Sequence, residues 1–275
     1  MEILFNELSL TGQFSDQDDF VKNALLPFIG ILKEMQGFSA LLLKKSDVWG
    51  KMVTPGSDLH SVLLSRKSDE VRRFKSAIAT LTREPFWDLD SLQEVEVSYL
   101  FDGNDVKGSS PAEACERDKV IVSFISSVTS CNPLNMLRNG TNISLLNLTC
   151  SGVLTDHLWS NKKITFESFV RARFTGERFD FSRIDKSMDF SRIQAQEQNL
   201  FIDTFRKVEK LTWGQVYTDR GLNYKEYHRV INESFRDKKT YKFRASQKIR
   251  CHGYRENDLF VVIGFEVDHR MSDRG

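Results

Sequence analysis

The sequence predicts an α/β protein of the α+β type, in which strands and short helices are interleaved. In residues 1–160, strand-like segments such as EVEVSYLF (94–101) and KVIVSFISS (119–127) flank the helical stretch PAEACERD (111–118). Near the C-terminus, two helical patterns are followed by a β-hairpin pattern. We therefore expect a mixed α/β domain over 1–160, a connector over 161–196 and a small basic helix-helix-hairpin module over 197–275.

The N-terminal elements follow from local patterns. Alternation over residues 2–10 predicts a strand with Ile3 and Phe5 inward. Ser15 and Asp18 resemble a capping box, so a helix is expected to begin there and to kink or break at Pro27. After these elements we expect a strand at FSALLL, helical segments over 58–66 and 68–83, and a later strand at NISLLNLTC.

The C-terminal elements begin with a short duplication. DFSRI occurs at 180–184 and again at 189–193, and we expect both copies in the connector. Helical spacing of apolar residues predicts one helix from about 200 to 211 and a second near 222–235. TYKFRASQKIRCHGY, a turn at 256–258 and LFVVIGFEVDH then predict a basic strand paired with an apolar one.

Composition is that of an ordinary soluble protein. The chain has 275 residues, of which 40% are hydrophobic and 28% charged, and no apolar run reaches the roughly 18–20 residues of a membrane span. The start, MEILFNELSL, is acidic where a secretory signal is basic. We therefore expect a cytoplasmic protein with no membrane partner. The four cysteines are widely separated and show no CxxC spacing, which favours free thiols.

Positive charge gathers near the C-terminus of an almost neutral chain. Residues 201–275 contain 16 Lys and Arg against 11 Asp and Glu. Within 236–255 the only acid is Asp237, against eight cations: Arg236, Lys238, Lys239, Lys242, Arg244, Lys248, Arg250 and Arg255. Such a local field favours a polyanionic partner, although a solvated strand face has the same composition.

Common catalytic motifs are missing from the sequence. There is no GxxxxGK[ST], GxGxxG, HExxH or GxSxG, and the five histidines form no ligand-spaced cluster. We therefore expect no cofactor and no metal. The alternative is a carboxylate metal site near Asp102 and Glu113, although the following strand lacks the Glu-x-Lys that a metal-dependent nuclease uses.

The basic hairpin carries residues suited to metal-independent RNA cleavage. That reaction needs a base for the 2′-hydroxyl, cations on the phosphate and an acid for the leaving oxygen. His269 titrates near neutrality and is the candidate base or acid. Arg244 and Arg250 offer bidentate donors for the phosphate, and Lys248 adds charge on the same strand face.

Further residues of the hairpin are expected to hold nucleic acid. Tyrosines can stack on bases, lysines and arginines can bind phosphates, and His252 is a second titratable group. The candidates are Lys238, Lys239, Tyr241, Lys242, His252, Tyr254 and Arg255. The structural alternatives are that Arg244 and Arg250 pair with Glu266 or Asp268 across the hairpin and that Tyr254 packs against it.

Residues 197–275 resemble RelE/HigB-type toxins, which are small metal-independent ribonucleases. The resemblance rests on two helices, a basic strand reading RASQKIR (244–250) and an apolar strand ending in VDHR (267–270). Ser246 stands where the family has Asn, and no Tyr separates Asp268 from His269. NELSL at the start and DHR at the end also resemble uncharacterised bacterial proteins linked to phage defence.

Two functions are therefore expected as alternatives. The first is a toxin-like or anti-phage endoribonuclease whose C-terminal module cuts RNA. The second is a non-catalytic subunit of a bacterial defence complex that binds nucleic acid or a protein partner through the basic hairpin. RNA cleavage in the presence of a chelator would favour the first, and salt-sensitive binding without cleavage the second.

Overall fold

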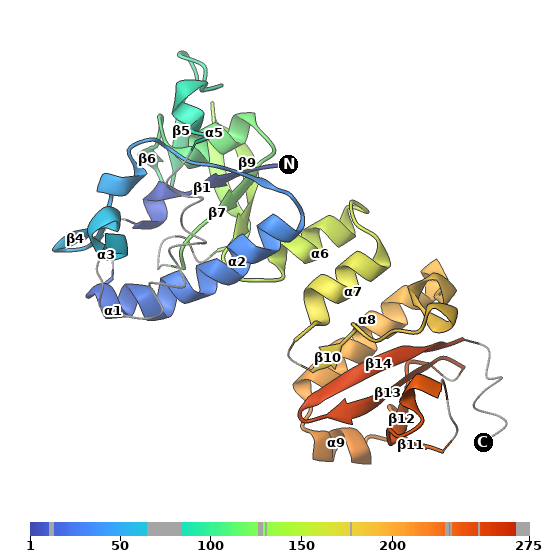
Figure 1. Cartoon of the computed structure of the whole chain (residues 1–275). Coiled ribbons are helices and arrows are strands. Elements are labelled where there is room, and N and C mark those ends of the chain that lie inside the picture. The colour runs from blue at the N-terminus through green and yellow to red at the C-terminus, as the bar shows by residue number, and fades with distance from the viewer. Residues whose placement is uncertain are drawn as a thin grey trace. The chain divides into compact units, whose positions relative to one another are not determined.

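The computed structural model contains two compact units, Met1–His157 and Leu158–Gly275 (Figure 1). It describes residues 1–267, apart from 11–13, 65–83, 126–128, 130, 177, 229–230, 232 and 247. Helices and strands alternate in both units, which confirms the mixed α/β class. The helix expected over 68–83 and the residues Asp268 and His269 lie outside the described part of the chain.

The first unit is built on a mixed sheet. Its described strands lie in the order β2-β1-β7-β9-β8-β5-β6, and β2, β1, β7 and β9 are mutually parallel. The strands of this unit, including a separate β3–β4 hairpin, are β1 (Glu2–Phe5), β2 (Leu41–Leu43), β3 (Met52–Thr54), β4 (Ser57–Asp58), β5 (Tyr99–Phe101), β6 (Asn104–Asp105), β7 (Val120–Val122), β8 (Leu134–Arg138) and β9 (Thr141–Leu148).

Helical segments connect these strands. They are η1 (Glu7–Leu10), α1 (Gln17–Phe20), the π-helical η2 (Val21–Leu25), α2 (Leu26–Gly37), η3 (Val48–Gly50), α3 (Leu59–Leu64), η4 (Trp87–Leu89) and α5 (Ser110–Glu116). Helix α6 (Val153–Ser160) follows β9 and contains the boundary between the two units, at His157 and Leu158. The predicted first strand is shorter than expected, because the chain turns into η1 after Phe5. Asp16, rather than Ser15, caps the first helix by accepting from the Asp19 amide, and Pro27 lies just after the π-helical turn.

The second unit contains a five-stranded sheet in the order β10-β14-β13-β12-β11. Its elements are α7 (Phe166–Phe174), β10 (Phe179–Asp180), η5 (Lys186–Met188), η6 (Phe190–Arg192), α8 (Ala195–Lys210), α9 (Trp213–Thr218), β11 (Lys225–Tyr227), η7 (Glu233–Phe235), β12 (Thr240–Arg244), β13 (Arg250–Glu256) and β14 (Leu259–Glu266).

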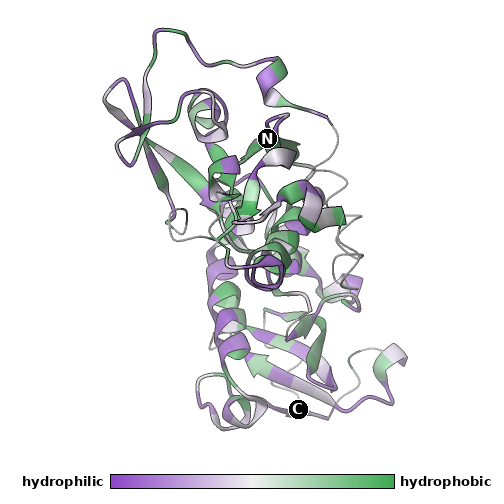
Figure 2. Cartoon of the chain, turned by 90° about the vertical axis from the view of Figure 1, so that its left-hand side faces the viewer, coloured by the Kyte–Doolittle hydropathy of each residue, from purple (hydrophilic) through white to green (hydrophobic). Residues whose placement is uncertain are grey.

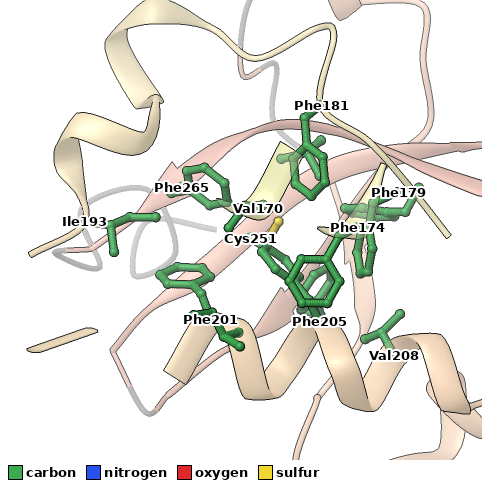
Figure 3. Close-up of a cluster of buried hydrophobic side chains, with 14 of the residues drawn as sticks. Val170, Phe174, Phe179, Phe181, Ile193, Phe201, Phe205, Val208, Cys251 and Phe265 are labelled. Atoms are coloured by element: carbon green, nitrogen blue, oxygen red, sulfur yellow. The ribbon is translucent and has the colours of Figure 1, made fainter. Parts of the chain in front are cut away.

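Helix α8 and one face of this sheet enclose an aromatic core. Phe201, Phe205 and Val208 of α8 point toward the sheet residues Cys251 and Phe265 (Figure 3). Along both units, hydrophilic and hydrophobic residues alternate on the helices (Figure 2), as expected for helices with one buried face.

Residues 161–196 are not a connector. They include α7 and β10, and their apolar side chains belong to the aromatic core.

The two DFSRI copies contain the same hydrogen-bonded turn. In each, the aspartate accepts a hydrogen bond from the serine amide two residues on, at 2.7 Å for Asp180 and 2.9 Å for Asp189. The following Phe181 and Phe190 are both buried. The repeat therefore anchors this segment to the core.

Two C-terminal expectations are also wrong. The segment 222–235 is not a helix, because it contains the strand β11 and the 3-10 turn η7. Asn223 has a φ of 45°, which a right-handed helix does not accommodate. The basic stretch 240–254 is likewise not one strand but two, β12 and β13, with a turn between them.

Candidate nucleic-acid interface

One face of the sheet of the second unit packs against the aromatic core, and the other carries charged side chains beside a small apolar cluster. On the charged face, Lys242 of β12 lies opposite His252 of β13, and Arg244 lies opposite Arg250. Glu266 of β14 lies opposite Arg250 on its other side. The two arginines therefore share a face, as predicted, but they lie on neighbouring strands rather than six residues apart on one strand.

Four ionisable side chains on this face form a buried ionisable cluster: Lys242, Arg250, His252 and Glu266. Each is 6% exposed or less. His252 Nε2 lies 2.8 Å from Glu266 Oε2, and the Tyr227 ring packs edge-on against the imidazole at 4.9 Å. The Lys242 ammonium lies 4.9 Å from the centre of the same tyrosine ring. Contrary to expectation, these residues do not form an open phosphate-binding face.

Burial controls the charge of His252. Desolvation lowers the pKa of its imidazole below the usual value, and the nearby Lys242 and Arg250 act in the same direction. Glu266 opposes this shift without cancelling it. The neutral imidazole can donate from Nε2 to Glu266, and Nδ1 has no hydrogen-bond partner within the described part of the chain. A carboxylate-oriented imidazole of this kind is the usual general base, but this one is 0% exposed.

Arg250 is fixed by the turn between β12 and β13. Its Nη1 donates to the carbonyl oxygens of Ser246 at 2.7 Å and Ile249 at 3.0 Å. Arg244, on the opposite strand, is half-buried, whereas Lys248 in the turn is exposed. Of the predicted catalytic residues, the fold therefore brings Arg244 and Arg250 together and leaves Lys248 in solvent. His269 lies outside the described residues.

The other predicted contact residues divide between surface and interior. Lys238 and Lys239 are exposed and pair with Glu256 at 3.5 Å and Glu226 at 2.7 Å. Tyr254 is buried in a small core with Val261 and Ile263, as its structural alternative anticipated.

Aromatic rings of α9, β12 and the segment before β11 gather around Tyr224, whose side chain is buried at 5% exposure. The Tyr224 and Tyr241 rings are stacked, with centroids 5.1 Å apart and planes 10° apart. Tyr217 meets Tyr224 edge-on at 4.8 Å and is 46% exposed. Trp213 packs against Tyr224 at 6.0 Å and is half-buried. We call the three partly exposed rings, Trp213, Tyr217 and Tyr241, the aromatic surface.

Cations border the aromatic surface. The Arg255 guanidinium lies 4.3 Å from the centre of the Trp213 ring, and that of Arg178 lies 5.6 Å from it. The Lys239 ammonium lies 5.8 Å from the Tyr241 ring. Rings combined with cations in this way suit the bases and phosphates of a single-stranded nucleic acid.

Sequence reasoning found only part of this surface. Tyr241, Lys239 and Arg255 were predicted contact residues, whereas Trp213 and Tyr217 were not among them. The spacing of Trp213 and Tyr217 is one helical turn, which indicates a shared helix face. Tyr224 carried no such signal, because its segment was predicted as helix and is the entry to a strand.

A small pocket of about 170 Å³ lies beside β11 and β12. Its lining includes the cations Arg236, Lys238 and Lys239 together with Glu226 and Tyr227. Tyr227 also contacts His252, so this side chain borders both the pocket and the buried ionisable cluster.

Glu113, which was expected near an alternative metal site, has a structural role in the first unit. Glu113 is fully buried and accepts hydrogen bonds from Ser91, the Leu92 amide and Arg117. Asp102 lies in the β5–β6 turn with a φ of 51°. Within the described ranges, no three His, Cys, Asp or Glu side chains are placed to share a metal ion.

All four cysteines are free thiols, of which Cys131 and Cys150 are exposed.

The wider comparisons give no family for this chain. It matches no known protein-family model and no curated protein. None of its described helices combines the length and the apolar character that a membrane crossing requires.

Proposed function

We propose that the C-terminal unit binds single-stranded RNA through the aromatic surface and its bordering cations. The observation that carries the proposal is the group of partly exposed rings, Trp213, Tyr217 and Tyr241, with Arg255 and Lys239 beside them. Each stacked base contributes about 1–3 kcal/mol in such sites and each phosphate contact adds a salt-dependent term. This corresponds to the non-catalytic alternative raised by the sequence.

The test is binding of a fluorescent single-stranded RNA to the full chain, measured by anisotropy at several salt concentrations. Tyr217→Ala and Tyr241→Ala should each weaken binding about 5- to 100-fold, the equivalent of one lost stacking contact. Arg255→Ala and Lys239→Ala should weaken it less and reduce the salt dependence.

Two control variants remove similar groups elsewhere in the same unit. Leu200→Ala truncates an apolar side chain of α8 that is 41% exposed, and Lys186→Ala removes an exposed cation beside β14, at the opposite side of the sheet from β11. Both should bind RNA like the parent chain. If the tyrosine variants fold normally and also bind like the parent, the aromatic surface is not the binding site.

A second candidate function is metal-independent RNA cleavage, as the resemblance to RelE/HigB-type toxins implies. The observation in its favour is His252, which is oriented by Glu266 and has an unpartnered Nδ1. Since the imidazole is 0% exposed, cleavage would require displacement of covering side chains, Tyr227 among them.

Cleavage of RNA by the parent chain in chelator tests this second function. His252→Gln should abolish cleavage, about 100-fold or more, while RNA binding at the aromatic surface persists. Cleavage that survives in this variant but is lost in His269→Gln would instead assign the role to His269. If the parent chain does not cleave RNA in chelator, RNA binding remains the proposed function.

A further inference from the structure

The N-terminal unit contains a pocket that the RNA-binding proposal does not use. It has a volume of about 260 Å³ and lies at the carboxyl end of β1, between η1, the residues after β2 and the loop before α5. Its charged lining consists of Glu7, Lys45, Lys51, Asp105 and Lys107. Ligands of open sheets with parallel strands bind outside the carboxyl ends of those strands, and this pocket has that position.

Glu7 lines the pocket and has an unsatisfied carboxyl oxygen. The side chain is buried, with 3% of its surface exposed, and its Oε1 accepts a hydrogen bond from the Ser110 amide at 2.9 Å. Oε2 is also buried but has no hydrogen-bond partner within the described part of the chain. Burial raises the pKa of this carboxyl. A buried carboxyl oxygen without a partner is costly, and a ligand hydroxyl would remove that cost.

The opposite charge comes from three lysines. Lys45 Nζ and Lys51 Nζ lie 3.7 Å and 3.1 Å from the same oxygen of Asp47, so two ammonium groups share one carboxylate. The Lys107 ammonium donates to the Val95 carbonyl. The carboxylate of Asp105 accepts from the Lys107 amide at 3.0 Å and is therefore engaged by its own loop. Ammonium groups grouped in this way suit a phosphate.

We infer that this pocket binds a phosphorylated sugar, with a sugar hydroxyl on Glu7 Oε2 and the phosphate on Lys45 and Lys51. Both halves of the ligand are required, because the pocket lining contains a carboxyl group with an unsatisfied oxygen as well as ammonium groups. The volume lies just below the ~300 Å³ at which ordinary small-molecule pockets begin. It therefore suits a single sugar phosphate, either free or as part of a mononucleotide whose base remains outside.

The experiment titrates the full chain with ribose 5-phosphate, adenosine monophosphate, ribose and inorganic phosphate, using calorimetry and thermal melting. Ribose 5-phosphate should bind at least about tenfold more tightly than ribose or phosphate alone, since each of these supplies one contact of the pair. A higher affinity for adenosine monophosphate would identify a nucleotide as the natural ligand, and equal affinities a free sugar phosphate.

The variants separate the two contacts. Lys45→Ala combined with Lys51→Ala should weaken binding of ribose 5-phosphate about tenfold or more, as expected for lost phosphate contacts. Glu7→Gln should reduce the advantage of ribose 5-phosphate over inorganic phosphate. Lys33→Ala, which removes an exposed lysine of α2 away from the pocket, should leave binding unchanged.

Three results would overturn the inference: no binding of either sugar phosphate at millimolar concentration, unchanged affinity in the double lysine variant, or equal affinity for inorganic phosphate and ribose 5-phosphate. If Glu7→Gln does not fold, the double lysine variant decides, because both lysines are partly exposed. RNA binding by the C-terminal unit is measured separately, so the two proposals can fail independently.

Discussion

At the scale of single residues, the sequence located the charged side chains but not their exposure. Lys242, Arg250 and His252 were predicted to contact nucleic acid from an open strand face. In the structure each is at most 6% exposed. Burial changes what His252 does, because desolvation keeps its imidazole neutral beside Glu266.

The lowered pKa of His252 predicts acid sensitivity of the C-terminal unit. A histidine of the unfolded chain titrates near pH 6.5, above the value in the folded state. As the pH falls through this range, the unfolded state takes up the proton first, so the free energy of unfolding should fall. The stability that neutral His252 contributes is fully present above the pKa of this histidine in the unfolded chain and is lost progressively below it.

Urea denaturation of the parent and of His252→Gln at pH 7.5 and pH 5.5 measures this effect. The difference in unfolding free energy between parent and variant should shrink at the lower pH, because glutamine does not titrate. The comparison between the two proteins removes contributions from other groups, such as Glu7, whose raised pKa acts on the N-terminal unit. A difference that is the same at both pH values contradicts the assignment.

At the scale of elements, a β-bulge determines which residues of β14 reach the core. Strict alternation places Phe260 and Val262 on one face and Phe265 on the other. The pairing of β13 with β14 shifts register between His252 and Gly253, and all three apolar residues belong to the aromatic core. Because β14 has one extra residue at this point, Val262 and Phe265 face the same side of the sheet although they are three residues apart.

The bulge also depends on the glycine beside it. A Cβ at Gly253 would lie 2.3 Å from the Val261 carbonyl oxygen and 2.5 Å from the Phe260 ring. We expect Gly253→Ala to lower the free energy of unfolding of the C-terminal unit by about 1–3 kcal/mol or more, since backbone must move to relieve the contact. Equilibrium urea denaturation measures this change.

Gly214 of α9 provides the matched control in the same unit. A Cβ there would meet no atom closer than 4.0 Å. Because alanine is the better helix former, Gly214→Ala should be neutral or stabilise by up to about 1 kcal/mol. Equal effects of the two substitutions would show that close packing at the bulge is not the reason for Gly253.

At the scale of the whole molecule, the chain divides into two units with separate cores. Phe265 is buried among the aromatic residues of the second unit, whereas Phe28 packs against Phe5 and Phe124 of the first. Each truncation to alanine should cost about 3–5 kcal/mol, but only in the unit that contains it. Calorimetry of the full chain should therefore show Phe265→Ala lowering one transition and Phe28→Ala lowering the other.

The surface variants Leu200→Ala and Leu92→Ala, at positions 41% and 48% exposed, are the controls for the two units and should leave both transitions in place. A single transition that both core variants lower equally would show that the units unfold as one cooperative body.

What the sequence determined by itself was the mixed α/β class, α5, α8 and the paired C-terminal strands. These elements rest on local causes: periodic apolar residues in α8, the N-cap residue Ser109 before α5, and the turn at Asn257. Helix 222–235 failed because pairing of β11 with β12 outweighed a local helical preference. Local pattern likewise could not show that residues 161–196 are part of the core.

Tertiary structure alone decided the candidate sites. The aromatic surface joins Trp213 and Tyr217 of a helix to Tyr241 of a strand, and the pocket at Glu7 joins segments about a hundred residues apart in sequence. No periodicity links such positions. Whether a charged side chain faces water or the interior is likewise set by what covers its strand, and this is the reason that the basic stretch was found in the sequence but its buried ionisable cluster was not.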